Sequence, residues 1–64
     1  MNDIKVTPDG YHFLVRALTP AGQNWLDDNI SHESSWMGPN LFVEGRYIEN
    51  LVAGMRGDGL EVIV

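Results

Sequence analysis

Apolar and polar residues alternate in two segments near the start of the chain. Residues 4–7 have the two-residue period of a strand, Pro8-Asp9-Gly10 has the composition of a turn, and residues 11–18 alternate again. This pattern predicts a β-hairpin. One face of its second strand is expected to meet the core, and it carries Tyr11, Phe13, Val15 and Ala17. The other face is expected to be partly solvated, and it carries His12, Leu14, Arg16 and Leu18.

A helix is predicted to follow the hairpin. Thr19 is a favoured N-cap residue, and Pro20 suits the first helical position because its missing N–H needs no partner there. The apolar residues that follow recur with helical spacing, as Ala21, Trp25, Leu26 and Ile30. This helix is expected to end near Asn29.

The second half of the chain begins with residues 31–40, which show no period and are expected to form a loop. Residues 41–43 predict a short strand, and residues 60–64 predict a last one. Between them a helix is expected from Gly45 to Gly57, with Gly57 in the left-handed conformation at its end. Its apolar stripe consists of Ile48, Leu51, Val52 and Met55. Gly54 indicates a close approach to the sheet or to the other helix.

These elements predict a single α+β domain over residues 1–64, in the order β-β-α-β-α-β. The expected architecture is a two-layer sandwich, with a four-stranded mixed sheet and both helices on one face. If the third and fourth strands are neighbours, the second helix joins them as a parallel pair with a right-handed crossover. The opposite face of the sheet would then carry His12, Leu14, Arg16, Glu61 and Lys5.

Size and charge narrow the classes of function. A chain of 64 residues without cysteine has a small core and no disulfides, so self-association or tight packing is expected to support it. The net charge of -5 and the scattered basic residues argue against direct nucleic-acid binding. No run approaches the roughly 20 apolar residues of a membrane span, and no export signal is seen at the start, so a cytoplasmic protein is expected.

Motifs for catalysis and metal binding are incomplete. His32-Glu33 resembles the start of a zinc-protease motif, but Trp36 stands where the second histidine belongs. His12 lies in a different element from His32, so no metal site is expected. We therefore expect no catalytic residue, no cofactor and no enzymatic activity.

Two short segments are candidates for contact with a partner. Trp36 and Met37 combine a large aromatic ring with a flexible thioether beside Gly38-Pro39, which is typical of an interface anchor. The alternative is that Trp36 folds back over the sheet edge or the open end of the core. Arg46 and Tyr47 at the start of the second helix are the other candidates, unless Arg46 pairs with a neighbouring glutamate.

Several runs together resemble small uncharacterised proteins of proteobacteria and their phages or prophages. The runs are Leu18-Thr19-Pro20-Ala21-Gly22, Trp25, residues 41–48, Gly54-Met55 and Asp58-Gly59-Leu60. The resemblance spans most of the chain. It implies a bacterial or phage accessory protein of the cytoplasm, and it assigns no residue a catalytic role.

The leading prediction is a non-enzymatic protein-interaction module. It would form a homodimer or dock on a larger host or phage protein through Trp36, Met37 and a sheet edge or uncovered face. One alternative is an inhibitor that mimics nucleic acid with the acidic residues Asp27, Asp28, Glu33, Glu44 and Glu49. Another is a small-ligand-binding or enzymatic domain with a site at a dimer interface, lined by Tyr11, His12, Trp36 and Arg46.

Overall fold

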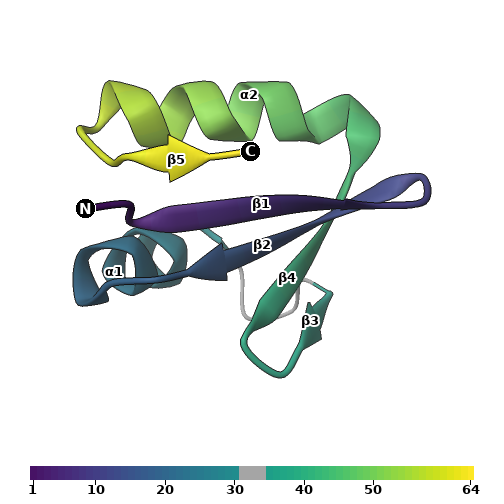
Figure 1. The fold of residues 1–64 in the computed structure, drawn as a ribbon, viewed down its shortest axis with the longest axis horizontal. Coiled ribbons are helices and arrows are strands. Elements are labelled where there is room, and N and C mark those ends of the chain that lie inside the picture. Colours follow the sequence, from purple (N-terminus) through teal and green to yellow (C-terminus); the bar gives the residue numbers. More distant parts are fainter. Residues whose placement is uncertain (31–34) are drawn as a thin grey trace.

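The computed structural model describes residues 1–30 and 35–64, which form a mixed sheet and two helices (Figure 1). The elements are β1 Ile4–Asp9, β2 His12–Ala17, α1 Pro20–Asn29, β3 Trp36–Met37, β4 Asn40–Glu44, α2 Gly45–Gly57 and β5 Val62–Ile63. The predicted α+β class is confirmed. The predicted number of four strands is wrong, because β3 lies within the segment expected to be a loop and makes the sheet five-stranded.

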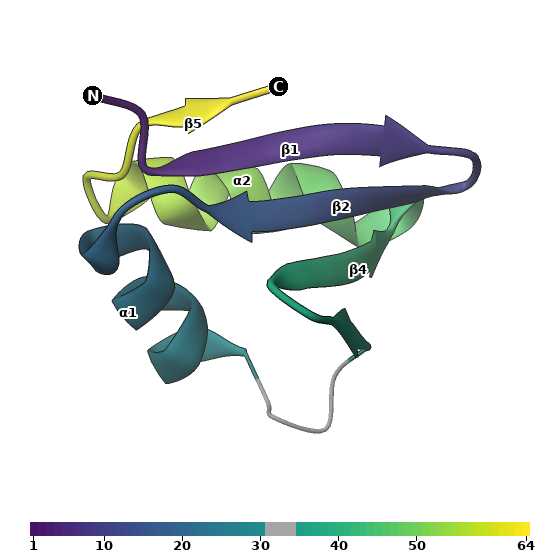
Figure 2. The ribbon, with the colours of Figure 1, turned by 60° about the horizontal axis from the view of Figure 1, so that its bottom comes forward.

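The strand order is β3-β4-β2-β1-β5, with the last strand at the edge of the sheet beside β1 (Figure 2). β1, β2, β4 and β3 are joined by antiparallel pairings, whereas β5 pairs in parallel with β1. The condition for a parallel pair across α2, that its two flanking strands are neighbours, is not met, because β2 and β1 lie between β4 and β5. α2 instead carries the chain from β4 past the central hairpin to the free edge of β1.

The hairpin closes one residue later than predicted. Asp9 pairs with His12, so the turn is the two-residue Gly10-Tyr11, and Gly10 has a φ of 63°. A left-handed residue at this place matches the twist of the two strands. Tyr11 is consequently 95% exposed at the tip, and its predicted core position is wrong. Pro8 is accommodated within β1 because β5 pairs only with the first two residues of that strand.

One face of the sheet forms the core. The strand residues buried there are Ile4, Val6, Val15, Leu41, Val43 and Val62. The register places Ile4 opposite Ala17 and Val15 opposite both Val6 and Leu41, so the inward side chains lie in continuous rows. Both helices add to the same buried cluster, with Leu26 from α1 and with Val52 and Met55 from α2.

α1 begins as predicted. The Thr19 hydroxyl accepts a hydrogen bond from the Gly22 N–H at 3.1 Å, and Pro20 is the first helical residue. The inner stripe differs by one position from the prediction, since Gly22 is buried and Ala21 is exposed. Gly22 is buried because α1 crosses the start of β1 there, and a Cβ on it would collide with the carbonyl oxygen of Asp3.

Asp3 links the start of β1 to the N-cap of α1 and to Glu61, the residue before β5. Its carboxylate accepts hydrogen bonds from the Thr19 hydroxyl at 2.7 Å and from the Glu61 N–H at 3.0 Å. Its main chain accepts from the Leu18 N–H and donates to the Glu61 carbonyl, each at 2.8 Å. The bonds from the Glu61 backbone and the Thr19 hydroxyl hold the pKa of the Asp3 carboxyl below its usual value.

α2 has the predicted bounds, and its four stripe residues are buried or pack against the core. Its end differs from the prediction, because Gly57 is still helical and Gly59 has the left-handed φ of 93°. The Leu60 N–H then donates to the Met55 carbonyl at 3.0 Å, which turns the chain towards β5.

The two helices touch near this turn. The Trp25 indole N–H donates to the Asp58 carboxylate at 2.7 Å, and the Trp25 ring lies 3.7 Å from the place of a Cβ on Gly54. Gly54 thus marks a close approach between the helices, as its sequence position indicates.

Gly22 of α1 and Gly54 of α2 allow a matched test of this packing. Gly22→Ala is expected to lower the free energy of unfolding by about 1–3 kcal/mol, because the new methyl group displaces the main chain at Asp3. Gly54→Ala meets only ordinary van der Waals contact and is expected to raise it by up to about 1 kcal/mol. Urea denaturation followed by circular dichroism measures both. Equal effects of the two substitutions would contradict the close contact at Gly22.

The lowered pKa of the Asp3 carboxyl predicts that acid destabilises the fold. Because its carboxyl has a lowered pKa in the fold, its stabilising effect is complete above about pH 4 and is lost as pH falls through the folded value. Asp3→Asn is expected to lower the melting temperature at neutral pH, and its difference from the unaltered chain is expected to shrink on acidification. Asp28→Asn, which removes an exposed carboxylate of α1, is the matched control. A difference that does not depend on pH would refute this role of Asp3.

Candidate functional site

The second face of the sheet is not covered by a helix in the described part of the chain (Figure 2). We call it the open face. Strand alternation and register place on it Lys5, Thr7, Asp9, His12, Leu14, Arg16, Met37, Asn40, Phe42, Glu44 and Ile63. The sequence predicts His12, Leu14, Arg16, Glu61 and Lys5 on this face. The register places four of them there, whereas Glu61 lies before β5 and has no position in the sheet.

Cross-strand pairing orders these side chains in three rows that run across β1, β2 and β4. The basic row consists of Lys5, Arg16 and Asn40. The apolar row consists of Thr7, Leu14 and Phe42. The acidic row consists of Asp9, His12 and Glu44. Met37 of β3 and Ile63 of β5 extend the basic row at its two ends.

The apolar row is the centre of the open face. Leu14 and Phe42 are direct cross-strand partners, and both are half-buried although no helix of the described residues covers them. The His12 ring meets the Phe42 ring edge to face, with centroids 6.1 Å apart and an interplanar angle of 87°. These contacts hold the Phe42 ring against the sheet and leave an apolar surface towards solvent.

Trp36 and Met37 lie on opposite sides of the sheet. Trp36 pairs with Leu41 and packs against the core cluster, so it closes the core beside β4. Met37 pairs with Asn40 on the open face, where it is 61% exposed. Of the two residues predicted as one anchor, only Met37 therefore stands on the open face.

Arg46 and Tyr47 lie at the start of α2, which directly follows Glu44 of the acidic row. The Arg46 guanidinium forms an ion pair of 3.1 Å with Glu44 and lies 4.8 Å from the centroid of the Tyr47 ring. Tyr47 is 53% exposed. The pairing of Arg46 with Glu44 agrees with the alternative considered for this segment, in which the arginine serves a local contact.

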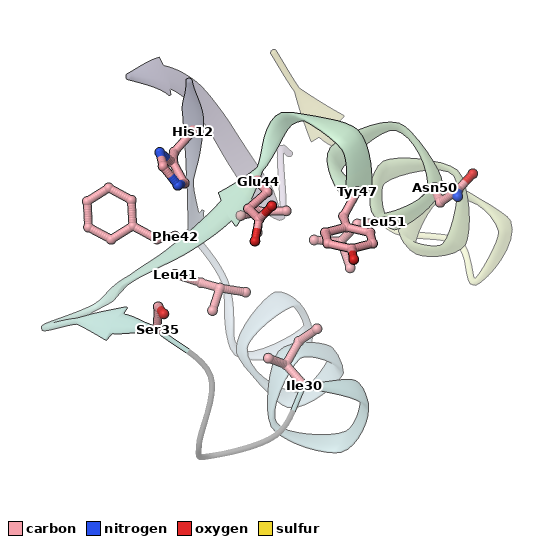
Figure 3. Close-up of a pocket in the computed structure, with 10 residues that line it drawn as sticks. His12, Ile30, Ser35, Leu41, Phe42, Glu44, Tyr47, Asn50 and Leu51 are labelled. Carbon is pink, nitrogen blue, oxygen red and sulfur yellow. The ribbon is translucent and has the colours of Figure 1, made fainter. Parts of the chain in front are cut away.

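A groove of about 850 Å³ runs between the ends of the two helices and β4 (Figure 3). Its lining includes Ile30 of α1, Leu41 of β4, and Tyr47 and Leu51 of α2. Of the four residues predicted to line a ligand pocket, His12 reaches this groove, whereas Tyr11, Trp36 and Arg46 are not in its lining. Ile30 and Ser35, which both line it, directly flank the four residues outside the described part, so we place the candidate site on the open face.

Charged and metal-binding groups are dispersed among the described residues. No three side chains of the types that bind metals come together within residues 1–30 and 35–64. His32 and Glu33 lie outside these ranges, and His12 contacts Phe42. Neither α1 nor α2 has the length and apolar character to cross a bilayer.

Phe42 is the residue of the open face that sequence reasoning missed. Residues 41–43 are all apolar, and such a run is typical of a strand buried on both sides. The alternation becomes visible only when the flanking polar residues Asn40 and Glu44 are included, because they share the parity of Phe42. The signal was therefore present, at the edges of the run.

The different surroundings of Trp36 and Met37 are testable. Trp36→Ala is expected to lower the free energy of unfolding by about 1–3 kcal/mol, because the ring packs on the core. Met37→Ala is expected to change it by less than about 0.5 kcal/mol, because the side chain is mostly exposed. Chemical denaturation at low micromolar concentration measures both values. A larger effect at Met37 than at Trp36 would contradict the assignment of the two faces.

Comparisons with models of protein families, with curated proteins and with solved structures found no match to this chain. The candidate site therefore rests on the geometry of the open face.

Proposed function

We propose that the chain is a non-enzymatic protein-interaction module and that the open face is its contact surface. The observation that carries the proposal is the apolar row, in which Leu14 and Phe42 lie side by side on a sheet face that both helices leave uncovered. Met37 adds an exposed, flexible apolar side chain nearby. A contiguous apolar surface bounded by polar residues is typical of a protein-contact site.

Association at this surface would be driven by the removal of the apolar row from water. Burial of apolar surface contributes about 25 cal/mol per Å², and the sheet already holds these side chains in place. Phe42 in particular is fixed by its contact with His12 and by its pairing with Leu14. Little conformational entropy is then lost when a partner covers the row, which favours binding by a rigid face.

The other predicted functions have weaker support. For an acidic mimic of nucleic acid, the Glu44 carboxylate is already paired with Arg46, and Glu33 lies outside the described residues. For a small-ligand site at a dimer interface, Tyr11 stands at the hairpin tip and Trp36 packs on the core side. The resemblance to proteins of bacteria and phages favours an accessory role in a bacterial cytoplasm, as part of the same proposal.

Site-specific photocrosslinking tests the contact surface. Three variants each carry one photoreactive phenylalanine analogue. The analogue replaces Phe42 on the open face, Tyr47 at the start of α2, which is the other predicted contact segment, or Asn24 on the exposed side of α1. After irradiation of living cells of the organism that produces the protein, we expect a defined covalent adduct from position 42 alone. The adduct shows whether the partner is another protein or the chain itself.

The controls decide the outcome. Adducts from position 47 in preference to position 42 would move the contact surface to α2 and refute the proposal. Equal labelling from all three positions would indicate random collisions. Each variant is first checked by circular dichroism, because an unfolded chain exposes every position.

A further inference from the structure

The charges on the open face are sorted by position. In β1 the side chains on this face run from Lys5 through Thr7 to Asp9. In β2, which is antiparallel, Arg16 stands beside Lys5 and His12 stands beside Asp9. The basic row and the acidic row thus lie at opposite ends of the face, with the apolar row between them.

The open face does not share the acidic excess of the chain. It carries the basic residues Lys5 and Arg16, and of its two carboxylates Glu44 is paired with Arg46, so Asp9 is the carboxylate of this face that has no ion pair among the described residues. The whole chain carries a net charge of -5, so the excess of negative charge lies on other surfaces. Among the described residues, neither Lys5 nor Arg16 forms an ion pair with a neighbour. A fitting partner therefore presents apolar groups in the middle and opposite charges at the two ends.

The open face itself has this arrangement. We infer that the partner is a second copy of the chain, packed face to face about a two-fold axis that runs along the apolar row. This inference rests on the proposed function and names its partner. Rotation about that axis places Lys5 of each copy over Asp9 of the other, while Arg16 comes over His12 and Asn40 comes over Glu44. Rotation about an axis along the strands would place basic row on basic row, which like-charge repulsion disfavours.

The contacts of this dimer follow from the register. Lys5 of one copy lies opposite Asp9 of the second copy, and the symmetric contact forms at the other end. Leu14 and Phe42 lie at the axis and meet the same residues of the second copy. Packed sheets stand about 10 Å apart and cross at about 30°, a distance that such side chains span.

The size of the face sets the strength of association. The Cα extents of the molecule are 27 × 21 × 17 Å, so the contact does not exceed the roughly 800 Å² per partner of a standard interface. We therefore expect dissociation constants in the micromolar range, and a mass that depends on concentration. The net charge of each copy adds long-range repulsion between the two copies, and salt screens it. The dissociation constants of all variants are therefore measured at the same ionic strength.

A charge-exchange experiment tests the geometry. Lys5→Asp creates acidic groups at both ends of β1 on the open face, and Asp9→Lys creates basic groups at both ends. In each variant alone, two repulsive contacts replace two attractive ones, and the dissociation constant is expected to rise about tenfold or more. An equimolar mixture of the two restores opposite charges at both contacts. It is expected to recover a dissociation constant within about threefold of the unaltered chain, measured by sedimentation equilibrium.

A control variant and three results decide the proposal. Asp28→Lys makes the same charge change as Asp9→Lys on exposed α1 and is expected to leave the dissociation constant unchanged. Association recovered only in the mixture supports the proposal, and misfolding cannot mimic it, because mixing does not rescue an unfolded chain. A dimer unaffected by the single substitutions overturns it. A chain that stays monomeric at millimolar concentration also overturns it, while an adduct of position 42 with a different protein would still support the interaction module.

Discussion

In the described residues, two helices cover one face of the sheet and leave the other without a layer, and the surface of the protein depends on this constraint. The residues that are fully buried, Ile4, Val15, Leu26 and Met55, all belong to the cluster between the helices and the sheet. With 64 residues, no further element of the described part reaches the other face. The side chains of alternate parity in β1, β2 and β4 are therefore left as a surface.

The helices cover the face that carries the apolar strand residues, and a few polar contacts link them to the sheet and to each other. Asp3 ties the N-cap of α1 and the approach to β5 to the start of β1. The Trp25 indole bound to Asp58 then joins α1 to the end of α2. Both helices pack on the same side because their buried residues join one apolar cluster with the strands. The open face results from this arrangement, and it combines an apolar centre with separated charges.

Local signals in the sequence predicted most elements, and tertiary pairing determined the rest. Thr19-Pro20 and the stripe of α2 are local features, and both helices have nearly the predicted bounds. β3 has two residues, too few to show a period in the sequence. It forms through its backbone pairing with the edge strand β4. The partner of β5 could not be predicted, since a short strand after a helix can pair at either edge of the sheet.

The candidate site was predictable in part. The alternation of the hairpin placed Leu14 and Arg16 on the uncovered side, as found. Trp36 and Met37 are adjacent in sequence and suggested one anchor, yet a strand directs neighbouring side chains to opposite faces. Self-complementarity of the charge rows requires the register of three strands, which only the structure supplies.

The most direct measurement of the central claim is an isotope-filtered NOE experiment on an equimolar mixture of labelled and unlabelled chain at millimolar concentration. Face-to-face packing about the apolar row predicts contacts from the Leu14 methyl protons of one copy to Leu14 or Phe42 protons of the second copy. The Ala53 methyl group, exposed on α2, is predicted to give none. Filtered NOEs that arise from Ala53 or Tyr47 and not from Leu14, or the absence of any, would contradict the account.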